Sequence, residues 1–320
     1  MKKDQLQTVP NILKRLAYLM RTEIKNRRLE IPGKFGKGFC TGFVFNEHIR
    51  MLISNYELNE DFIIENPDIH IPGRMIFFKF QHIFPLTVTS PATQRARAIP
   101  SVLIATSRMN TDVMIPIHTN TATINIEVDA NYLNGLFDFS ERSPVLQRLL
   151  QNTQPLLFEQ MIHPALQQIV DEIVAEPPSE TFELFFLRVK AEELICRLLM
   201  ELEKRDEKRL YDLNIQDIQT IYKVKAQMLG RLETPPVIAA LAVSAGMSPT
   251  KLKRLFRQIF GNGIFNYYQE FRMKEAALLL KEKKLSVADT GYRLGFTNLS
   301  HFSRVFSAHI GMKPKQYSRS

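Results

Sequence analysis

Cysteine and long apolar runs are what this sequence has least of. Only two of the 320 residues are cysteine, Cys40 and Cys196, and neither has metal-ligand spacing or a histidine nearby. We expect two buried free thiols, as in a protein of the reducing cytoplasm. No segment approaches the roughly 18 apolar residues of a membrane-spanning helix. No apolar run follows the basic N-terminus, so we predict a cytoplasmic protein without a signal peptide or membrane contact.

Groups that support catalysis are missing as well. The sequence has no glycine-rich phosphate loop and no nucleophile elbow. Its histidines lack the His-x-His pair with a carboxylate that a cupin metal site uses. Those of the first 120 residues are His48, His70, His82 and His118. We therefore predict no catalytic residues, no metal, no cofactor and no enzyme.

Acidic residues are scarce in the last hundred positions. Residues 221–320 contain 17 lysines and arginines against 5 aspartates and glutamates, a net charge of +12. Because the whole chain carries +9, the first 220 residues carry −3. Such an asymmetry indicates that one part of the protein meets a polyanion and the other does not.

Residues 33–130 have the pattern of a β domain. Short apolar runs lie between Pro, Asn and Gly, and Ile124, Ile126 and Val128 alternate with polar residues. A two-residue period is typical of a half-buried strand. The pattern predicts a compact β-sandwich or barrel. Its aromatic residues near 35–45 and 77–84 either line an apolar pocket or belong to an ordinary core.

Helices are predicted after residue 143. The longest segment, 181–211, has an apolar stripe at steps of three and four residues. The stripe packs either on the β domain or against a second subunit, and its members are Leu184, Leu187, Ala191, Leu194, Ile195, Leu198 and Leu202. We thus predict an α+β protein, with a β-rich domain and trailing helices over 1–210 and an all-α domain over 211–320.

A ten-residue segment occurs twice in the all-α part. Residues 252–261 and 302–311 both read apolar–x–Arg–apolar–Phe and end with glycine. Each copy follows a Gly-apolar-hydroxyl tripeptide that starts at Gly246 or Gly295, where glycine suits a left-handed helix end. A continuous helix over 265–284 is predicted to join the copies. This layout predicts two helix-turn-helix units, with double-stranded DNA as the partner.

Capping residues indicate where the helices of these units begin. Ser248 precedes the first copy, and Thr297 or Asn298 precedes the second. Thr234 and Ser286 are predicted to cap the helix before each copy.

The side chains that the two copies turn outward are expected to meet DNA. Basic and amide groups suit guanine and adenine edges in the major groove, and cations also bind phosphate. In the first unit they are Thr250, Lys251, Lys253, Arg254, Arg257 and Gln258. In the second they are Leu299, Ser300, Ser303, Arg304 and Ser307, so we expect weaker phosphate attraction there. Arg254 and Arg304 either bind DNA or brace the preceding helix.

The last hundred residues resemble the AraC/XylS family of bacterial transcription regulators. The resemblance covers about 217–320. The residues that carry it are Leu241-Ala242, Gly246-Met247-Ser248, Leu252-x-Arg254-x-Phe256, Arg272-Met273-x-x-Ala276, Gly295-Phe296, Phe302-Ser303-Arg304-Val305-Phe306 and Gly311-Met312-Lys313-Pro314-x-x-Tyr317. Thr290-Gly291 departs from the family pattern of Ile-Ala. Glycine costs about 1 kcal/mol of helix propensity relative to alanine. We therefore expect the second unit to be less stable than the first and to contact DNA less firmly.

The resemblance implies a sequence-specific transcription regulator. It implies base contacts in the first unit at Thr250, Lys253, Arg254 and Arg257, and in the second unit at Asn298, Leu299, Ser300, Ser303 and Arg304. It implies a cupin-like effector-binding and dimerisation domain before the DNA-binding domain. The implied partners are DNA, a small-molecule effector, the transcription machinery and a second copy of the chain. The runner-up among DNA-binding proteins is an architectural protein without a ligand. The alternative outside that class is a cupin-type enzyme or small-molecule-binding protein with a basic DNA-associated tail.

Overall fold

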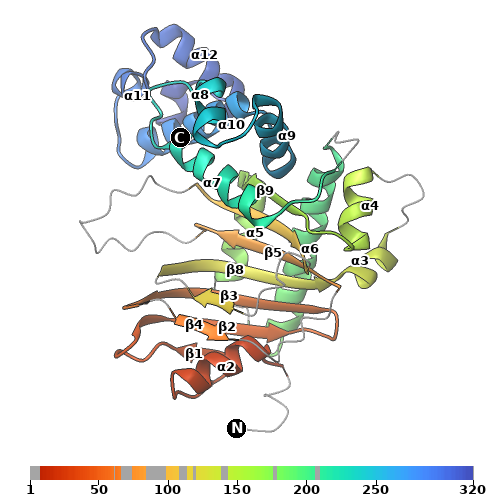
Figure 1. The fold of residues 1–320 in the computed structure, drawn as a ribbon. Helices are drawn as coiled ribbons and strands as arrows, with labels where there is room; N and C mark the ends of the chain where they lie inside the picture. Colours follow the sequence, from red (N-terminus) through yellow and green to blue (C-terminus); the bar gives the residue numbers. More distant parts are fainter. Residues whose placement is uncertain are drawn as a thin grey trace. The chain divides into compact units, whose positions relative to one another are not determined.

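A computed structural model describes residues 8–60, 62–65, 74–83, 99–107, 114–117, 120–137, 143–175, 179–205 and 210–319 (Figure 1). These residues form two compact units. The first contains the described residues up to Asp212 except Ile99, and the second contains Ile99 and the residues from Leu213 onward. The first contains a large antiparallel sheet and helices, and the second is helical. The mixed helix and sheet class predicted from the sequence is therefore confirmed. In the described part of the chain, no helix is long and apolar enough to cross a membrane.

A sheet of seven antiparallel strands dominates the first unit (Figure 1). Its order is β1-β2-β3-β8-β5-β6-β9, so strands far apart in the sequence lie side by side. Their bounds are β1 Arg28–Glu30, β2 Gly36–Val44, β3 Ile49–Leu58, β8 Asn120–Asp129, β5 Met75–Gln81, β6 Ser101–Thr106 and β9 Leu157–Met161. A smaller sheet pairs β4 (Phe62–Glu65) with β7 (Met114–Ile117).

One face of the seven-stranded sheet is apolar. On β5, Ile76, Phe78 and Phe80 occupy alternate positions and are fully buried. The register places Ile126 of β8 opposite Phe78 on one side and Ile104 of β6 on the other. Cross-strand pairs of this kind stabilise a sheet through direct side-chain packing. Together these residues belong to one core cluster, so the aromatic side chains of β5 at Phe78 and Phe80 are core residues.

Helices complete this core. Helix α6 (Glu183–Glu203) buries its apolar stripe in the same cluster as the sheet, so the stripe packs on the β domain. The alternative of a second subunit on that stripe is thereby excluded. Three shorter helices contribute to the first unit, namely α3 (Ala130–Leu136), α4 (Pro144–Gln151) and α5 (Pro164–Val174).

The sheet extends beyond the segment 33–130 predicted to hold the strands. β1 pairs with β2 at its start, and β9 follows α4 and pairs with β6. These additions depend on pairing between distant segments, which the local alternation of residues does not encode. The aromatic segment 77–84 is described only to Ile83, so Phe84 lies outside the described residues.

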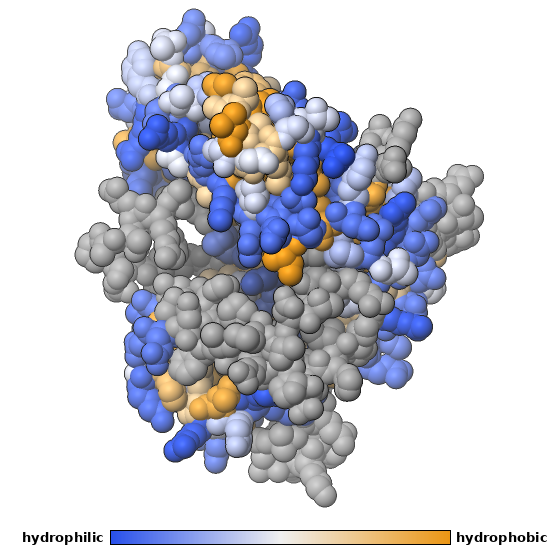
Figure 2. Space-filling view, viewed as in Figure 1, coloured by the Kyte–Doolittle hydropathy of each residue, from blue (hydrophilic) through white to orange (hydrophobic). Residues whose placement is uncertain are grey.

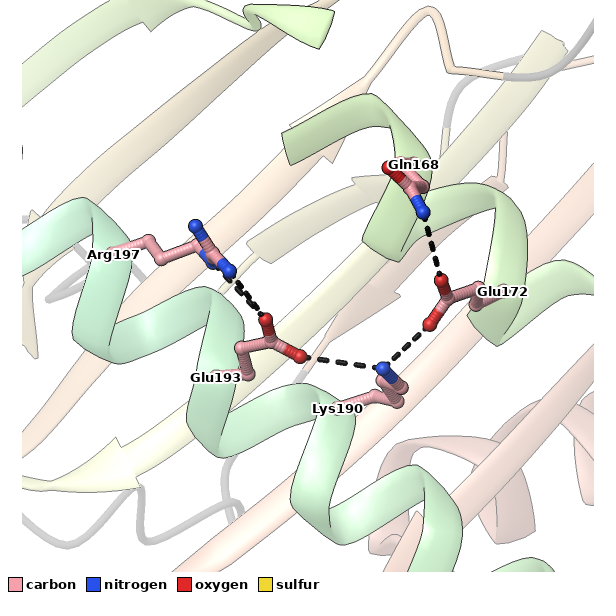
Figure 3. Close-up of polar contacts among 5 residues, drawn as sticks. All are labelled: Gln168, Glu172, Lys190, Glu193 and Arg197. Atoms are coloured by element: carbon pink, nitrogen blue, oxygen red, sulfur yellow. Dashed lines mark hydrogen bonds and ion pairs between the residues drawn. The ribbon is translucent and has the colours of Figure 1, made fainter. Parts of the chain in front are cut away.

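A chain of polar contacts joins α5 to α6 (Figure 3). Lys190 Nζ lies 2.5 Å from Glu172 Oε2 on α5 and 3.3 Å from Glu193 Oε2 on its own helix. Arg197 and Gln168 extend the chain at its two ends. Hydrogen bonding to Glu172 raises the pKa of Lys190. The contacts fix the packing of α5 on α6 through partly exposed pairs, which contribute little stability individually.

Helix α2 (Asn11–Leu19) forms a second cluster with the first strands. Leu13 packs there with Leu29 and with Cys40, which is fully buried. A Cβ on Gly42 would lie 2.7 Å from Cδ of Pro10, so glycine permits this close contact. Burial raises the pKa of the Cys40 thiol to about 12. Both cysteines are free as predicted, although Cys196 is only half-buried.

The second unit consists of seven helices in the described residues (Figure 1). They are α7 (Ile215–Leu229), α8 (Ile238–Ser244), α9 (Pro249–Phe260), α10 (Ile264–Lys281), α11 (Val287–Arg293), α12 (Leu299–Ile310) and α13 (Pro314–Tyr317). The two duplicated segments form α9 and α12, and α10 is the predicted connecting helix. Figure 2 shows that most of the visible surface of this unit is hydrophilic, with an apolar area near its middle.

Most of the predicted caps are present. Ser248 accepts from the backbone N–H of Lys251, and Ser286 accepts from that of Asp289. Asn298, rather than Thr297, caps α12. The prediction for Thr234 was wrong. Helix α8 begins at Ile238, after both prolines that follow Thr234. Its N-cap residue is Val237, whose side chain cannot accept a hydrogen bond.

Candidate nucleic-acid interface

Helix α9 has one exposed face that consists of basic side chains and a hydroxyl group. Ser248 and Pro249 start the helix, and Gly261 ends it with a positive φ of 72°. Leu252, Leu255, Phe256 and Ile259 are buried. The side chains opposite this stripe are Thr250, Lys253, Arg254 and Arg257, and all four are exposed. Spacing of three and four residues places them on one side of the helix, as a helix entering a groove requires.

Two predicted DNA-binding residues do not belong to this face. Gln258 is only 3% exposed, so the prediction that it points outward was wrong. Lys251 Nζ lies 2.9 Å from Asp217 Oδ1 on α7. Lys251 and Gln258 are seven residues apart, which puts them on the same side of α9. Helix α7 packs on α9, and the periodicity of α9 alone gives no sign of that neighbour.

Helix α12 presents a less charged version of the same face. Ser300 and Arg304 are exposed, and Ser303 is half-buried. At positions fifty residues after Lys253 and Arg257 of α9, α12 has Ser303 and Ser307. Asn298 uses its side-chain oxygen to cap the helix, accepting from His301 N at 2.9 Å, and its side chain is exposed.

Leu299, predicted to lie on the outward face, packs against Gly291 of helix α11. Its side chain is half-buried, and a Cβ built on Gly291 would lie 2.8 Å from Leu299 Cδ2 and 3.3 Å from Phe302 Cδ1. The glycine that departs from the family pattern therefore has a packing role between α11 and α12. Its neighbour Thr290 is fully buried, and its hydroxyl has no hydrogen-bond partner in the described structure.

Two basic residues that follow the duplicated segment, Lys313 and Arg319, were not among the predicted DNA contacts and lie just after α12. A shallow hollow of about 780 Å³ is lined by Ser307, Gly311, Met312, Lys313, Gln316 and Arg319. Lys313 and Arg319 are exposed. Because Ser307 both lines the hollow and occupies the α12 position that corresponds to Arg257, the hollow adjoins the α12 face. The signal in the sequence is the basic spacing of Lys313, Lys315 and Arg319 after the second copy.

Helix α10 holds the two helix-turn-helix units together. Tyr268 donates its hydroxyl to the Leu232 carbonyl at 2.6 Å, before the first unit. One turn later, Arg272 donates from Nε to the Leu294 carbonyl at 2.8 Å, in the second unit. Arg272 is 4% exposed and lies over the Phe296 ring, so the arginine of this motif is structural. Burial lowers its pKa, and Tyr268 opposes that shift.

The turn of the second unit also touches the segment that leads into the first. Gly295 has a φ of 78°, and a Cβ there would lie 2.1 Å from the carbonyl oxygen of Glu233. Two independent requirements thus select glycine at this position, the left-handed backbone and the close approach of another chain segment. The two units consequently share one support made of α10 and residues 232–233.

The described residues contain no group of three or more metal-ligating side chains. Of the histidines considered from the sequence, His70 and His118 lie outside the described residues. His48 stacks on Tyr132 with ring centroids 4.7 Å apart.

Comparison with known proteins identifies the fold motif of the second unit. A family model described as a helix-turn-helix domain matches residues 241–320. The HTH-type transcriptional regulator GlxA of Rhizobium meliloti is 35% identical over 96 residues, which cover 30% of each chain. The arabinose operon regulatory protein of Escherichia coli is 34% identical over 80 residues, covering 25% of this chain and 27% of that protein. The chain thus spans less than a third of the length of these relatives.

A solved structure gives a similar partial match. It is a transcriptional regulator with an AraC-type DNA-binding domain from Chromobacterium violaceum, 27% identical. The match covers 33% of this chain and 95% of that one, with a TM-score of 0.31.

Proposed function

The chain belongs to the AraC/XylS family through its C-terminal helix-turn-helix domain, and from that membership we propose that the whole protein is a sequence-specific DNA-binding transcription regulator. The observation that carries the proposal is the exposed face of α9, with Thr250, Lys253, Arg254 and Arg257 on a helix-turn-helix support. The same part of the sequence holds the excess of positive charge, which suits a polyanionic partner.

Helix α9 is proposed to enter the major groove of duplex DNA. Arginine and lysine reach the acceptor atoms of guanine, and Thr250 suits either a base edge or a phosphate. Lys253 has no ion-pair partner among the described residues, so its charge is available to phosphate. Arg254 lies in the middle of the face and is our choice for base recognition.

Helix α12 is proposed to read a second, neighbouring site. Ser300, Ser303 and Arg304 offer two hydroxyls and one guanidinium, and the Asn298 amide lies at the start of the helix. We propose that Lys313 and Arg319, beside this face, supply the phosphate contacts that α12 itself lacks. Because α10 supports both units, their spacing is fixed, which suits successive major grooves about 34 Å apart.

The first 210 residues are proposed to be a cupin-like domain that binds a small-molecule effector. The antiparallel sheet with trailing helices supports this assignment. An effector can shift the protein between two states only if it binds them with different affinity. We therefore expect effector binding to alter how α9 and α12 are presented to DNA.

Homodimerisation and contact with the transcription machinery complete the proposed function. The side of α6 that faces away from the core has exposed apolar residues, with Phe185 70% exposed and Met200 56% exposed. Exposed apolar side chains of this kind suit contact with a second copy of the chain. We propose that the protein acts in the cytoplasm and is not an enzyme.

The experiment that tests this function is site selection followed by mutation. The unmodified full-length protein should enrich particular duplexes from a random pool. Arg254→Ala should weaken binding to the selected duplex by about 1–3 kcal/mol, because a bidentate base contact contributes about that much discrimination. Titration of the selected and random duplexes in a mobility-shift assay measures the difference.

Arg74→Ala is the matched control. Arg74 is an exposed arginine in the first unit, before β5, so the variant loses the same charge without changing α9. It should bind the selected duplex like the parent. If Arg254→Ala retains full preference for the selected duplex, the assignment of α9 as the reading helix is wrong.

A further inference from the structure

The second face of the seven-stranded sheet has a different composition from the apolar face. On β5, the residues that alternate with the core are Phe77, Lys79 and Gln81. The register pairs Lys79 with Asn125 of β8 on one side and with Leu103 of β6 on the other. This face is therefore a mixture of polar and apolar side chains at the centre of the sheet.

The polar residues of this face are withdrawn from solvent. Lys79, Gln81 and Asn125 are all only partly exposed, and Ser101 is buried. A face in open contact with water would leave long side chains such as Lys79 exposed. Gln81 donates to the Ser101 hydroxyl at 3.0 Å, which satisfies part of the polar surface internally.

Lys79 is the cation of this face that has no partner among the residues that the structure describes. No hydrogen bond or ion pair to its ammonium occurs in the described residues. Burial lowers the pKa of Lys79. The neighbouring carboxylate on this face, Glu127, is 3.5 Å from the guanidinium of Arg50 and is thus engaged. Asp129, on the same face of β8, accepts a hydrogen bond from the backbone N–H of Tyr132. Glu159 lies on β9 opposite Leu103, with β6 between it and Lys79.

We propose that this face of the sheet binds a small molecule with an anionic group, for which the Lys79 ammonium is the counter-ion. The inference rests on the proposed effector function of the first 210 residues and names the chemical class of the effector. A partly buried cation is stabilised by a charge-assisted hydrogen bond to a carboxylate, phosphate or sulfonate. Phe77 and Leu103, beside Lys79, supply apolar contact for the rest of the molecule.

A matched pair of fluorescent probes tests the proposal. 1-Anilinonaphthalene-8-sulfonate has an anionic group, and N-phenyl-1-naphthylamine has the same rings without it. We expect the full-length protein to bind the sulfonate more tightly than the neutral probe. Lys79→Met should weaken sulfonate binding about tenfold or more, because a hydrogen bond to a charged group is lost, and should leave the neutral probe unchanged.

Two further variants separate charge from structure. Lys37→Met removes an exposed lysine from β2 that pairs with Glu57, and it should not alter either affinity. Lys79→Arg keeps the positive charge and should retain the preference for the sulfonate. Lys79→Met should also raise the melting temperature of the protein without probe, because it removes a partly buried charge that has no partner in the described residues. Lys79→Gln repeats the measurement if the methionine variant does not fold.

The results distinguish this inference from the proposed function. Equal sulfonate affinity in Lys79→Met and the parent overturns the anion site, and so does an equal loss of both probes. Each variant is also titrated with the selected duplex in the absence of probe. Failure of the parent to bind any duplex selectively would overturn the proposed regulator, and it would leave the probe comparison unaffected.

Discussion

At the scale of single residues, glycine has two different roles in the second unit. Gly295 and Gly311 have almost the same backbone angle, with φ of 78° and 79°. A Cβ on Gly311 would meet nothing within 4 Å, whereas one on Gly295 would collide with the backbone of Glu233. Substitutions at both positions meet the strain of a left-handed backbone, but only a substitution at Gly295 also meets a steric clash. Comparing the two therefore separates these effects.

We predict that Gly295→Ala is the more damaging of the two substitutions. Both variants should lose about 1–2 kcal/mol because a residue with a Cβ is placed in the left-handed region. Gly295→Ala should lose roughly 1–3 kcal/mol more, since the overpacked site must move backbone atoms. Urea-induced unfolding followed by circular dichroism measures both. Equal unfolding midpoints would show that the contact between Gly295 and Glu233 does not contribute.

At the scale of secondary-structure elements, the exposed basic face of α9 contains fewer residues than the helical periodicity of the sequence predicts. The sequence identifies the buried stripe, the capping residues Ser248 and Ser286, and the exposed Arg254. It does not identify Gln258 as buried or Lys251 as paired, because both results depend on how the neighbouring helices pack on α9. Leu299 is a similar case, since its half-burial depends on contact with Gly291 of α11.

The paired state of Lys251 gives a prediction about the salt dependence of DNA binding. Lys253→Ala should reduce the slope of log affinity against log salt by about 0.9, the value for one phosphate contact. Lys251→Ala should change the slope less, because the Lys251 ammonium lies 2.9 Å from Asp217. Titrations of the selected duplex at several salt concentrations provide both slopes. A larger change for Lys251→Ala would mean that Lys251 leaves Asp217 and meets the DNA.

The cations beyond α12 are expected to behave like Lys253. The double variant Lys313→Ala and Arg319→Ala should reduce the salt slope by about 1.8, if each side chain meets one phosphate. Its affinity loss should be similar for selected and random duplexes, because phosphate contacts carry no direct sequence information. An unchanged slope would place the hollow beside α12 away from the DNA backbone.

At the scale of the whole molecule, charge and packing divide the chain in the same way. The basic excess lies in the last hundred residues, and the contacts separate the described chain after Asp212, with Ile99 alone of the earlier described residues grouped with the second unit. The α+β class was predictable because strand alternation and helical stripes are local patterns. The order of the seven strands was not, because β8 pairs with β3 and β5 across long stretches of sequence.

We predict that residues 211–320 fold and bind DNA without the rest of the chain. The core around Phe302 and Phe306 uses only residues from Leu232 onward. The isolated fragment should give the circular dichroism of a helical protein and should prefer the selected duplex over a random one. Residues 1–210 should not bind either duplex. An unfolded fragment would show that the second unit depends on the first for stability.

The shared support of the two helix-turn-helix units has a consequence for the DNA. Tyr268, Arg272 and Gly295 tie both units to α10 and to residues 232–233, so the protein has little freedom to adjust α9 relative to α12. Where the two helices do not match a straight duplex, the duplex must bend, and the cost depends on the deformability of its base steps. Flexible steps such as TA or CA between the two contacted sites should therefore raise affinity, although no side chain touches them.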